Sequence, residues 1–563
     1  MTLLYGRELQ DGKTARSLEY LMAGEHTYCS ASVGGNTRKY HGLLVHRGRV
    51  YLAALDEHVN GERISAQQYQ GAAGDEGLSH LFSFSLYPPC WTCMIGDALV
   101  RKTISFGQGV TITYAVTGVA SLTIRPLIAD RPVDQVVRDP HPDYEADMAG
   151  VRWNEIVLEG DLPFTQDPAT YRNDRYEQEH ERGYDPVEDL FSPGYFNGTV
   201  RDGSVSLRCF LSNHGAGKVT TTSSPASPRE WLDYAAETFC HNNEIFAGYH
   251  WFPESWGRDS AISIAGLLIE RDRKETTQAV LKRLAQKMVG GVIPNRFPDN
   301  YLSSDASLWF IHALGRYRRR WGDDRFIAGM RPIVAEILGQ YPESGVATLD
   351  HDLIRVVPRS TWMDTVYTPR EGKPVEINAL WIHALDEAES MGIIPPVSVE
   401  SATEAFRAFW NEGAQCLYDR IDPVDPAIRP NQVIALGLGL VEADHATAAL
   451  ETVTRELLTP YGLRTLSPRD PAYRGRFEGD SSYHNGCVWP WLTGSYVEAL
   501  LRNGRDRQAI ACLLLPILSH IREAGAGYIS EIFDGDPPFR PRGCIAQAWS
   551  VAEISRACRM VFP

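Results

Sequence analysis

Two carboxylates of this chain lie among aromatic or apolar neighbours, in segments far apart in the sequence. Asp364 ends the run Thr-Trp-Met-Asp at 361–364, and Glu531 lies in Ser-Glu-Ile-Phe-Asp-Gly-Asp at 530–536. A carboxylic acid beside an indole is poorly solvated as an anion, so its pKa rises and it can act as a general acid. A partner that stays ionised can activate water. Such a pair predicts glycoside hydrolysis, and a separation of about 6.5–9.5 Å would leave room for the water of an inverting mechanism.

Each of these carboxylates has a second interpretation. An Asp that ends a Trp-Met-Asp triplet is, taken singly, commonly a cap or a satisfied turn carboxylate. Asp534 and Asp536 lie close to Glu531 in the sequence. They either raise the basicity of Glu531 by like-charge repulsion or only cap the turn at Gly535, and we favour the turn.

Tryptophan is concentrated in the second half of the chain, partly in loops rich in Gly, Pro and Asp. Sugar rings present apolar C–H faces that stack on indole, while their hydroxyls need fixed polar partners, so such loops suit carbohydrate. Tryptophans within helical patterns are expected to pack in the core. The loop set is Trp251, Trp256, Trp362 and Trp489, and the helical set is Trp309, Trp381, Trp410 and Trp549.

Charged and amide side chains recur where loops meet helices. Arg258 and Asp259 stand where a helix begins. Asp259 is therefore either the N-cap or, together with the guanidinium, a grip on sugar hydroxyls. Three further junctions repeat the style of an amide, Arg or His near an aromatic residue, and they contain Asn295, Arg296, Arg429, Asn431 and His484. Helix ends are where a helical toroid opens its cavity, so these groups predict a polar pocket there.

The composition is that of a folded protein with an acidic surface. The 563 residues are 43% hydrophobic and 22% charged, with a formal net charge of −16. Phosphate binding relies on a basic surface, so the charge argues against nucleic acid and disfavours an anionic membrane. The longest apolar stretches, around 261–269 and 433–441, are too short to span a bilayer. Residues 1–17 lack the apolar core of a signal peptide.

Ten cysteines are scattered through the chain as in a reduced, cytoplasmic protein. Cys90 and Cys93 form one Cys-x-x-Cys pair. A single pair without a second pair or nearby His ligands is weak evidence for zinc, and we expect no metal there.

The hydrophobic pattern changes near residue 225. Before it, alternating or β-branched runs separated by Gly, Asp and Asn are typical of antiparallel strands. After it, helical patterns recur and fit a toroid of inner and outer helix pairs. A polar, proline-bearing joint lies between them, at 220–228. The expected strands are 103–106, 110–116, 122–127, 151–158 and 205–211. The expected helices are 230–242, 259–271, 274–289, 305–321, 325–340, 376–391, 399–413, 431–441, 444–458, 489–502, 506–522 and 545–559.

Several motifs, in the expected order along nearly the whole chain, resemble the bacterial and archaeal glycogen debranching enzymes of the amylo-α-1,6-glucosidase type. They are the stretches 35–44, 256–259, 361–364, 373–381, 464–468, 483–484 with 488–491, and 530–535. The resemblance implies an α+β multidomain chain. Residues 1–222 are expected to form an N-terminal antiparallel β-sandwich, 223–229 a linker, and 230–563 a C-terminal all-α (α/α)6 barrel.

The same resemblance implies roles for individual side chains. It makes Asp364 the general acid and Glu531 the general base of an inverting hydrolysis that releases glucose from α-1,6 branch points of glycogen or limit dextrins. It implies no cofactor and no metal. The expected substrate-binding residues are Trp256, Arg258, Asp259, Asn295, Arg296, Trp362, Glu376, Arg429, Asn431, His484 and Trp489. Departures from the usual Thr, Gln and Thr are Ser260, Asn485 and Cys487.

Alternatives remain open at this level. The same fold serves glucoamylase-like, trehalase-like and phosphorolytic enzymes, and a catalytically silent glycan-binding protein would share the aromatic loops. The chain has neither the length nor the alternation for the additional (β/α)8 transferase barrel of the eukaryotic enzyme. The expected partners are a branched α-glucan or oligosaccharide and a separate 4-α-glucanotransferase. In the N-terminal part, Arg38, Lys39 and His41 either complete the sugar pocket or, as we favour, pack within the fold.

Overall fold

The computed structural model describes residues 2–70, 76–212, 225 and 227–562. It divides into two compact units, Met1–Glu230 with Arg522–Gly527, and Trp231–Ile521 with Tyr528–Pro563. The expected joint at 220–228 and linker at 223–229 fall largely on residues 213–224 and 226, which lie outside the described ones. A domain border at residues 222–230 therefore stays a proposal. The short segment Arg522–Gly527, far along the sequence, belongs to the N-terminal unit, and no sequence pattern predicted this.

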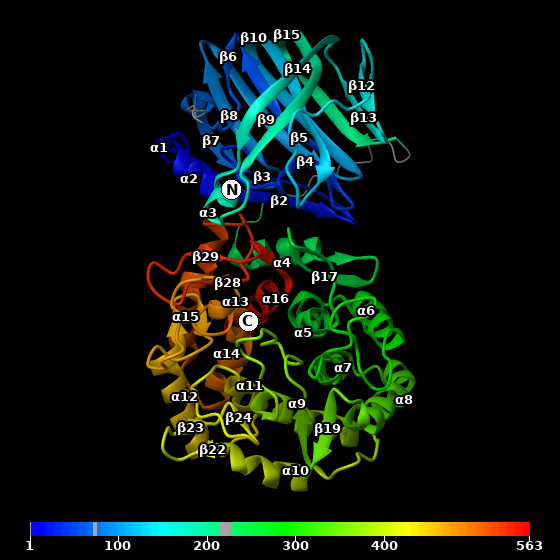
Figure 1. Ribbon diagram of the computed structural model, residues 1–563, viewed down its shortest axis with the longest axis vertical. Coiled ribbons are helices and arrows are strands. Elements are labelled where there is room, and N and C mark those ends of the chain that lie inside the picture. The colour runs from blue at the N-terminus through cyan, green and yellow to red at the C-terminus, as the bar shows by residue number, and fades with distance from the viewer. Residues whose placement is uncertain (1, 71–75, 213–224, 226, 563) are drawn as a thin grey trace. The chain divides into compact units, whose positions relative to one another are not determined.

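The N-terminal unit is built from antiparallel strands, drawn blue to cyan in Figure 1. Three short helices, α1 (Arg7–Gln10), α2 (Gly12–Ser17) and α3 (Glu177–Glu181), accompany them. The strands are β1 (Thr2–Tyr5), β2 (Glu19–Gly24), β3 (Thr27–Ser32), β4 (Gly42–His46), β5 (Arg49–Val59), β6 (Glu62–Arg63), β7 (Leu81–Ser85), β8 (Cys90–Ile95), β9 (Ala98–Phe106), β10 (Gly109–Pro132), β11 (Glu145–Asp147), β12 (Gly150–Trp153), β13 (Ile156–Gly160), β14 (Phe164–Arg175) and β15 (Val187–Leu211).

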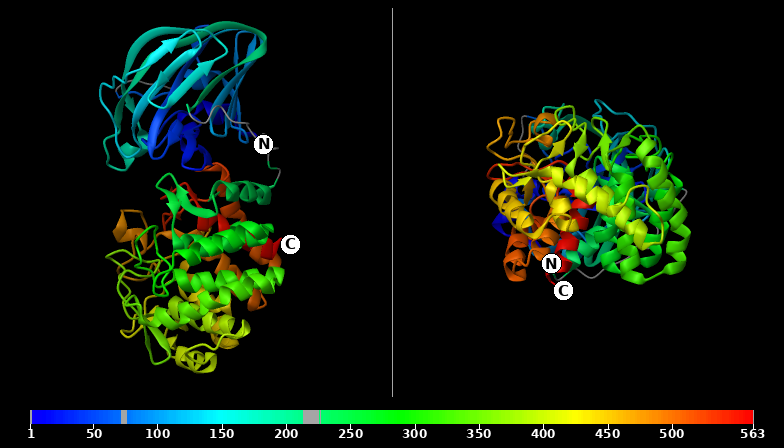
Figure 2. Two further views of the ribbon diagram at one scale, coloured as in Figure 1. Left: turned by 90° about the vertical axis from the view of Figure 1, so that its right-hand side faces the viewer. Right: turned by 90° about the horizontal axis from the view of Figure 1, so that it is seen from below.

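Two long strands, β10 and β15, join the layers of this unit. The first part of β10 pairs with β9 and its last part with β5, while β15 pairs first with β14 and then with β13. Each strand thus serves in two sheets, one running from β1 to β13 through β9 and the other through β2–β5 and β14. Alternate side chains of β10, such as Ile112 and Tyr114, are buried, which places a core between the layers. The expected β-sandwich is confirmed, and Figure 2 shows its curved sheets.

The sequence pattern divided β10 into two strands, 110–116 and 122–127. The structure joins them, with a register shift between Val116 and Val119. Gly118 lies at this irregularity with φ +91°, a conformation that glycine adopts without steric cost. A glycine that signals a turn in sequence here marks a bulge within one strand.

The residues of the N-terminal motif bind within their own unit. Arg38 Nε and His41 Nε2 lie 2.9 and 2.8 Å from Glu19 Oε2, and Lys39 Nζ donates to the Asp134 carbonyl at 2.8 Å. These contacts support the packing interpretation. Cys90 and Cys93 are buried, free thiols on β8.

The C-terminal unit is helical, coloured green to red in Figure 1. Each of the expected helical segments coincides with a helix among the described residues. These are α4 (Pro228–Thr238), α5 (Gly257–Leu267), α6 (Lys274–Gln286), α7 (Ala306–Trp321), α8 (Asp324–Gln340), α9 (Val375–Ser390), α10 (Val399–Phe406), α11 (Gln432–Leu438), α12 (Ala443–Leu457), α14 (Thr493–Arg502), α15 (Arg507–Ser519) and α16 (Ala548–Val561), with a short additional α13 (Asp480–Tyr483).

Alternate helices close into a ring. Helix α5 packs on α7, α7 on α9, α9 on α11, α11 on α14, α14 on α16, and α16 returns to α5. Every residue of α5 is buried, as expected for an inner helix, whereas α12 between α11 and α14 buries one face only. Since one outer helix separates consecutive inner helices, all inner helices run in the same direction. The (α/α)6 barrel is thereby confirmed.

Short strands connect the helices and carry much of the site. They are β16 (Cys240–His241), β17 (Glu244–Tyr249), β18 (Phe252–Ser255), β19 (Ala347–Asp350), β20 (Leu353–Val356), β21 (Lys373–Pro374), β22 (Trp410–Asn411), β23 (Cys416–Leu417), β24 (Arg420–Ile421), β25 (Leu458–Thr459), β26 (Gly462–Arg464), β27 (Val488–Trp489), β28 (Ile532–Phe533), β29 (Pro541–Arg542) and β30 (Ala546–Gln547). Among the described residues, none of the helices combines the length and apolar composition that crossing a bilayer requires.

Candidate active site

The predicted site residues gather where the inner helices begin. Arg258 and Asp259 lie in the first turn of α5, and Glu376 in the first turn of α9. Asn431 immediately precedes α11, and Gln547 immediately precedes α16. Because the inner helices share one direction, these side chains collect at one end of the ring, as the sequence predicted.

Asp364 lies on the long loop between β20 and β21. Its carboxylate accepts a hydrogen bond from Arg258 Nη1 at 3.2 Å, and its side chain keeps 37% of its surface exposed. Burial among protein atoms raises the pKa of Asp364, and the Arg258 charge opposes this rise without cancelling it. Asp305, at the start of α7, holds Arg258 from the other side, with Oδ1 at 2.9 Å from Nε. Asp364 is thus both reachable from solvent and biased towards its protonated form.

Glu531 precedes β28 and is enclosed, with 3% of its surface exposed. Tyr483 Oη donates to Glu531 Oε1 at 2.5 Å, and the Cys544 backbone N–H donates to Oε2 at 2.9 Å. Burial raises the pKa of Glu531, the two hydrogen bonds lower it, and the negative charge of Asp364 adds to the rise. The mutual electrostatic influence shows that both carboxylates belong to one site. A side chain at Gly543 would collide with Oε2, because a Cβ there would lie 2.3 Å from it.

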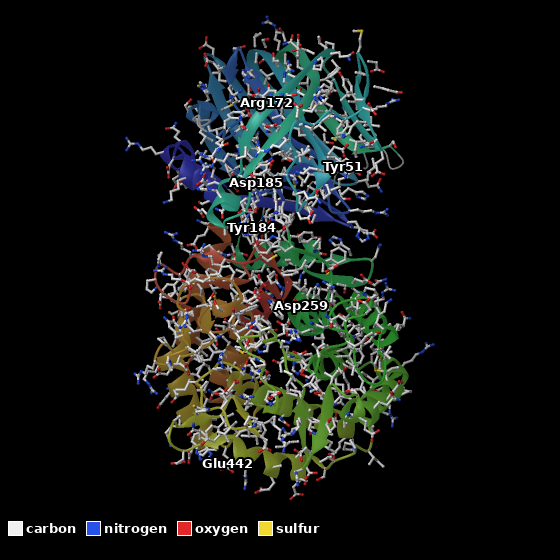
Figure 3. All side chains as sticks on the ribbon, viewed as in Figure 1. Tyr51, Arg172, Tyr184, Asp185, Asp259 and Glu442 are labelled. Carbon is white, nitrogen blue, oxygen red and sulfur yellow. The ribbon has the colours of Figure 1, made fainter. Side chains whose placement is uncertain are left out.

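Asp259 is a third carboxylate of the same site (Figure 3). It is 5% exposed and accepts a hydrogen bond from Gln547 Nε2 at 3.3 Å. Burial raises the pKa of Asp259 to about 7; the Arg258 charge lowers it, and the Glu531 and Asp364 charges raise it. Three carboxyl groups around one guanidinium therefore compete for protons.

An aromatic cluster supports the loop that carries Asp364. Trp362 is 3% exposed and donates through Nε1 to Asn431 Oδ1 at 2.8 Å. Its ring lies edge-on to Trp489, with centroids 5.2 Å apart, and Trp489 is 2% exposed. The sheet that pairs Val488 of β27 with Phe533 of β28 brings this cluster beside the Glu531 segment. Both loop tryptophans are buried, so their indole faces pack on other rings.

A buried ionic network continues from this cluster. Arg370 binds Glu376, with Nη2 to Oε2 at 2.8 Å, and also Asp419, with Nε to Oδ2 at 2.7 Å. Asn431 Nδ2 donates to Asp419 Oδ1 at 2.7 Å, which links the network to Trp362. Glu376, expected to contact sugar, is 1% exposed and faces Arg370. Arg370 and Asp419 were not predicted from sequence, because each is a single charged residue in a loop.

Arg429 and His484 also bind protein groups. Arg429 Nη1 donates to the carbonyls of Thr465 and His484 at 3.0 and 2.6 Å, and Nη2 donates to Asn485 Oδ1 at 2.9 Å. His484 Nδ1 lies 3.3 Å from Thr368 Oγ1. Burial and the Arg429 charge lower the pKa of His484, so its ring is neutral. Arg429 therefore shapes the loop of 465–485.

Trp256, Asn295 and Arg296 lie together beside α5. The Arg296 guanidinium lies 5.7 Å from the centroid of the Trp256 ring, and the Asn295 carbonyl accepts from the Gly257 backbone N–H at 2.9 Å. Arg296 is exposed and Trp256 is partly exposed. Together with Asp364, they are the predicted residues with the most access to solvent.

Several buried polar atoms of the site have no hydrogen-bond partner among the described residues: His484 Nε2, Gln547 Oε1, Asn295 Oδ1, Trp256 Nε1 and Trp549 Nε1. A buried polar atom without a partner is costly. A ligand rich in hydroxyl groups can supply partners for all of them. Prediction from sequence missed Asp305, Tyr483, Gln547 and Cys544, although Tyr483 stands within a motif that carried the resemblance.

Comparisons with known proteins agree with this architecture. The family model described as Amylo-alpha-1,6-glucosidase matches residues 229–556, and the one described as Glycogen debranching enzyme N terminal matches residues 24–206. A Glycogen debranching enzyme of Saccharomyces cerevisiae is 25% identical over 369 residues, covering 43% of this chain and 24% of the yeast protein. The match thus spans about a quarter of that relative.

Solved structures from Thermus thermophilus are also similar. An uncharacterized conserved protein gives a TM-score of 0.49 at 15% identity, covering 59% of this chain and 99% of the other. A mannosylglycerate hydrolase in complex with glucose gives 0.48 at 14% identity, with the same coverage. The family match over residues 229–556 decides the question of kinship: the chain belongs to the amylo-alpha-1,6-glucosidase family and is a glycoside hydrolase.

Proposed function

We propose that this enzyme hydrolyses α-1,6-glucosidic branch points of glycogen or limit dextrins with inversion and releases glucose. The observation that carries the proposal is the pair Asp364 and Glu531. Both pKa values are raised, one carboxyl is open to solvent, and the other is enclosed and bound by two donors. The family description and the yeast relative support the linkage.

In this mechanism Asp364 is the general acid. It protonates the glycosidic oxygen as the C–O bond to the glucosyl stub breaks. A sugar that fills the site excludes water from Asp364, and this loss of solvation raises its pKa further against the pull of Arg258. The leaving chain departs with the proton of Asp364.

Glu531 is the general base. It takes a proton from water, whose oxygen attacks the anomeric carbon from the opposite face, so that glucose leaves in the β configuration. Tyr483 and the Cys544 N–H hold the carboxylate and leave it ionised when Asp364 is protonated. Proton and charge balance when the two carboxyls exchange states over one turnover.

Other side chains bind or position the substrate. Arg258, Asp259 and Gln547 surround the terminal glucose, and Trp256 with Arg296 contact the chain beyond it. Trp362, Trp489, Asn431, Glu376 and Arg429 hold the catalytic loops, because each is engaged with protein groups. The unpartnered atoms of His484 and Asn295 accept or donate to sugar hydroxyls.

Product analysis tests the proposal. Proton NMR of a glucosyl-branched limit dextrin treated with the enzyme should show loss of the α-1,6 anomeric signal and initial appearance of β-glucose. Panose and isomaltose, compared with maltose, report whether the α-1,6 linkage is preferred. Faster release from maltose would favour a glucoamylase-like enzyme, phosphate-dependent release a phosphorylase, and glycogen binding without any glucose a silent glycan-binding protein.

Substitution tests the assigned pair. Asp364→Asn and Glu531→Gln should each lower turnover by at least about 10², a typical contribution of a positioned acid or base. Glu371→Gln changes an exposed carboxylate of the same long loop and serves as the matched control. Near-normal turnover of either catalytic variant on a branched dextrin would exclude that residue.

We further propose that a separate 4-α-glucanotransferase in the cytoplasm trims branches to a single glucose before this enzyme acts. No disulfide joins any of the cysteines that the structure describes, which suits a reducing compartment. Adding a purified transferase to a phosphorylase-treated dextrin should increase the glucose released. An unchanged yield would mean that the enzyme accepts longer branches by itself.

A further inference from the structure

A second cavity lies at the opposite end of the helical ring from the candidate active site. It measures about 490 Å³, and its walls come from the C-terminal ends of the inner helices, including His312 and Arg316 of α7, His383 of α9 and Glu498 of α14. Asp305 of the active site precedes the same α7. At 1.5 Å per residue, Asp305 and Arg316 are separated by roughly 16 Å along the helix axis. The two sites therefore share the inner helices but not their side chains.

Arg316 is the unusual cation of this cavity. Its side chain is 16% exposed, and its two ion pairs, to Glu270 and Glu498, are 3.5 and 3.6 Å long. Within the described residues it forms no hydrogen bond, although a guanidinium offers five N–H donors. Glu498 instead accepts from Arg556 Nη1 at 2.6 Å. Arg316 thus keeps a fork of donors available beside the cavity.

The other arginines of this region are engaged. Arg319 binds Glu387, and Arg320 binds Asp272. The remaining charge available to a ligand at the inner wall is therefore that of Arg316.

Two imidazoles lie on the same wall. His312 Nδ1 and His383 Nε2 are 3.0 Å apart. In the part of the chain that the structure describes, the second nitrogen of each ring has no hydrogen-bond partner. Burial and the charges of His383, Arg316 and Arg556 lower the pKa of His312, and burial with the Arg319 charge lowers that of His383 to about 4. The rings are neutral and stand in a positive local potential, which an anion would relieve.

We propose that this cavity binds a small phosphorylated polyol, with the phosphoryl group on Arg316, His312 and His383. Guanidinium forks match the geometry of phosphate oxygens, and imidazole N–H groups add donors. Glu270 and Glu498 stand beside Arg316 and accept hydrogen bonds from hydroxyl groups. Inorganic phosphate has no such hydroxyls and is repelled by these carboxylates, so the phosphate ester binds more tightly than the free ion. The site would take a ligand of hexose-phosphate size, which the cavity volume accommodates.

Isothermal titration of the full chain tests the proposal, with glucose 6-phosphate as the probe. Inorganic phosphate and glucose form the two comparison arms. Saturable binding of the ester, with weaker binding of both comparison compounds, is expected. Arg316→Gln and, separately, His383→Asn should each weaken binding at least about tenfold, since a charge-assisted hydrogen bond contributes that much. Arg283→Gln, which alters an arginine paired with Glu244 outside the cavity, should bind as the wild type does.

Thermal unfolding of each variant shows whether it is folded at the titration temperature. Two variants on different helices keep the test valid if one fails to fold. A crystal soaked with the probe locates the phosphorus atom. Density at Arg316 supports the proposal. Absence of saturable binding, equal affinity for glucose, unchanged affinity in both variants, or density only beside Asp364 would each overturn it.

Discussion

Two donors hold the ionised form of Glu531, the Tyr483 hydroxyl and the Cys544 backbone N–H, against a burial that favours its protonated form. Asp364 has one donor, Arg258, and remains partly open to solvent. The difference between the two carboxyls is therefore a difference in hydrogen bonding. It separates an acid from a base where composition alone shows two acidic residues.

Tyr483→Phe should shift the acidic limb of the pH–rate profile to higher pH. Loss of the hydroxyl removes a bond that lowers the pKa of Glu531, so its pKa rises. A base must be ionised, hence kcat/KM should fall most at low pH and recover as pH increases. Tyr496→Phe, which loses a hydroxyl bonded to Thr454, is the control and should leave the limb in place. An unmoved limb in the Tyr483 variant would rule out the positioning role.

Asp259→Asn should stabilise the fold at neutral pH while reducing activity. The folded-state pKa of Asp259 is about 7, above its unfolded value of 3.8. For a carboxyl whose pKa is raised on folding, stability is greatest below the unfolded pKa. It is lost as pH rises towards the folded pKa, by about 1.4 kcal/mol for each pH unit between the two values. The Tm of the variant minus that of the wild type should therefore increase between about pH 4 and pH 7. A difference independent of pH would contradict the raised pKa.

At the scale of elements, the loop that carries Asp364 is held from below by Arg370, Glu376 and Asp419. Arg370→Met should destabilise the enzyme by about 3–5 kcal/mol, because it leaves buried carboxylates without their cation. Arg355→Met changes a half-exposed arginine paired with Asp350 and should cost less than about 1 kcal/mol. Chemical denaturation measures both. Equal losses would show that the network contributes no more than a surface pair.

The helices were predictable because each has a repeating apolar face, and the ends were less so. The segment expected at 399–413 ends as a helix at Phe406, since Trp410–Asn411 turns into a strand that pairs with Cys416–Leu417. The segment expected at 489–502 begins at Thr493, because Trp489 belongs to β27. Long-range pairing decided both, and local periodicity does not record it.

The candidate site divides in the same way. Asp364 and Glu531 stand in distinctive runs and were found from sequence, as was the Arg258–Asp259 pair. Asp305, Arg370 and Asp419 became visible only when the ring brought separate helix starts together. Trp362 and Trp489 were expected to face sugar, yet a loop position in sequence does not reveal that other rings cover it.

At the scale of the whole molecule, the chain leaves the helical unit after Ile521 and returns at Tyr528. In between, the Ala526 N–H donates to the Glu19 carbonyl, and the Glu19 N–H donates to the Ala524 carbonyl, both at 2.7 Å. Ser530, shortly after the return, lies 2.9 Å through Oγ from His520 Nε2. The segment next to the proposed base is therefore anchored at both ends.

Ala526→Pro should destabilise the protein and lower turnover. Proline removes the N–H that binds Glu19, and an unpaired buried carbonyl costs about 1–3 kcal/mol. Ala526→Gly retains the N–H and is the control. Thermal unfolding and glucose release, measured on the same preparations, should fall together in the proline variant. Wild-type stability would show that this backbone pairing is dispensable.

The excursion of residues 522–527 also constrains how such a gene could be rearranged. A recombination event that joined the helical unit to a foreign N-terminal domain would leave these residues without the strand edge that receives them. The break would fall a few residues before Glu531. Exchange between lineages should therefore preserve both units as a single inherited block, even though each has its own core.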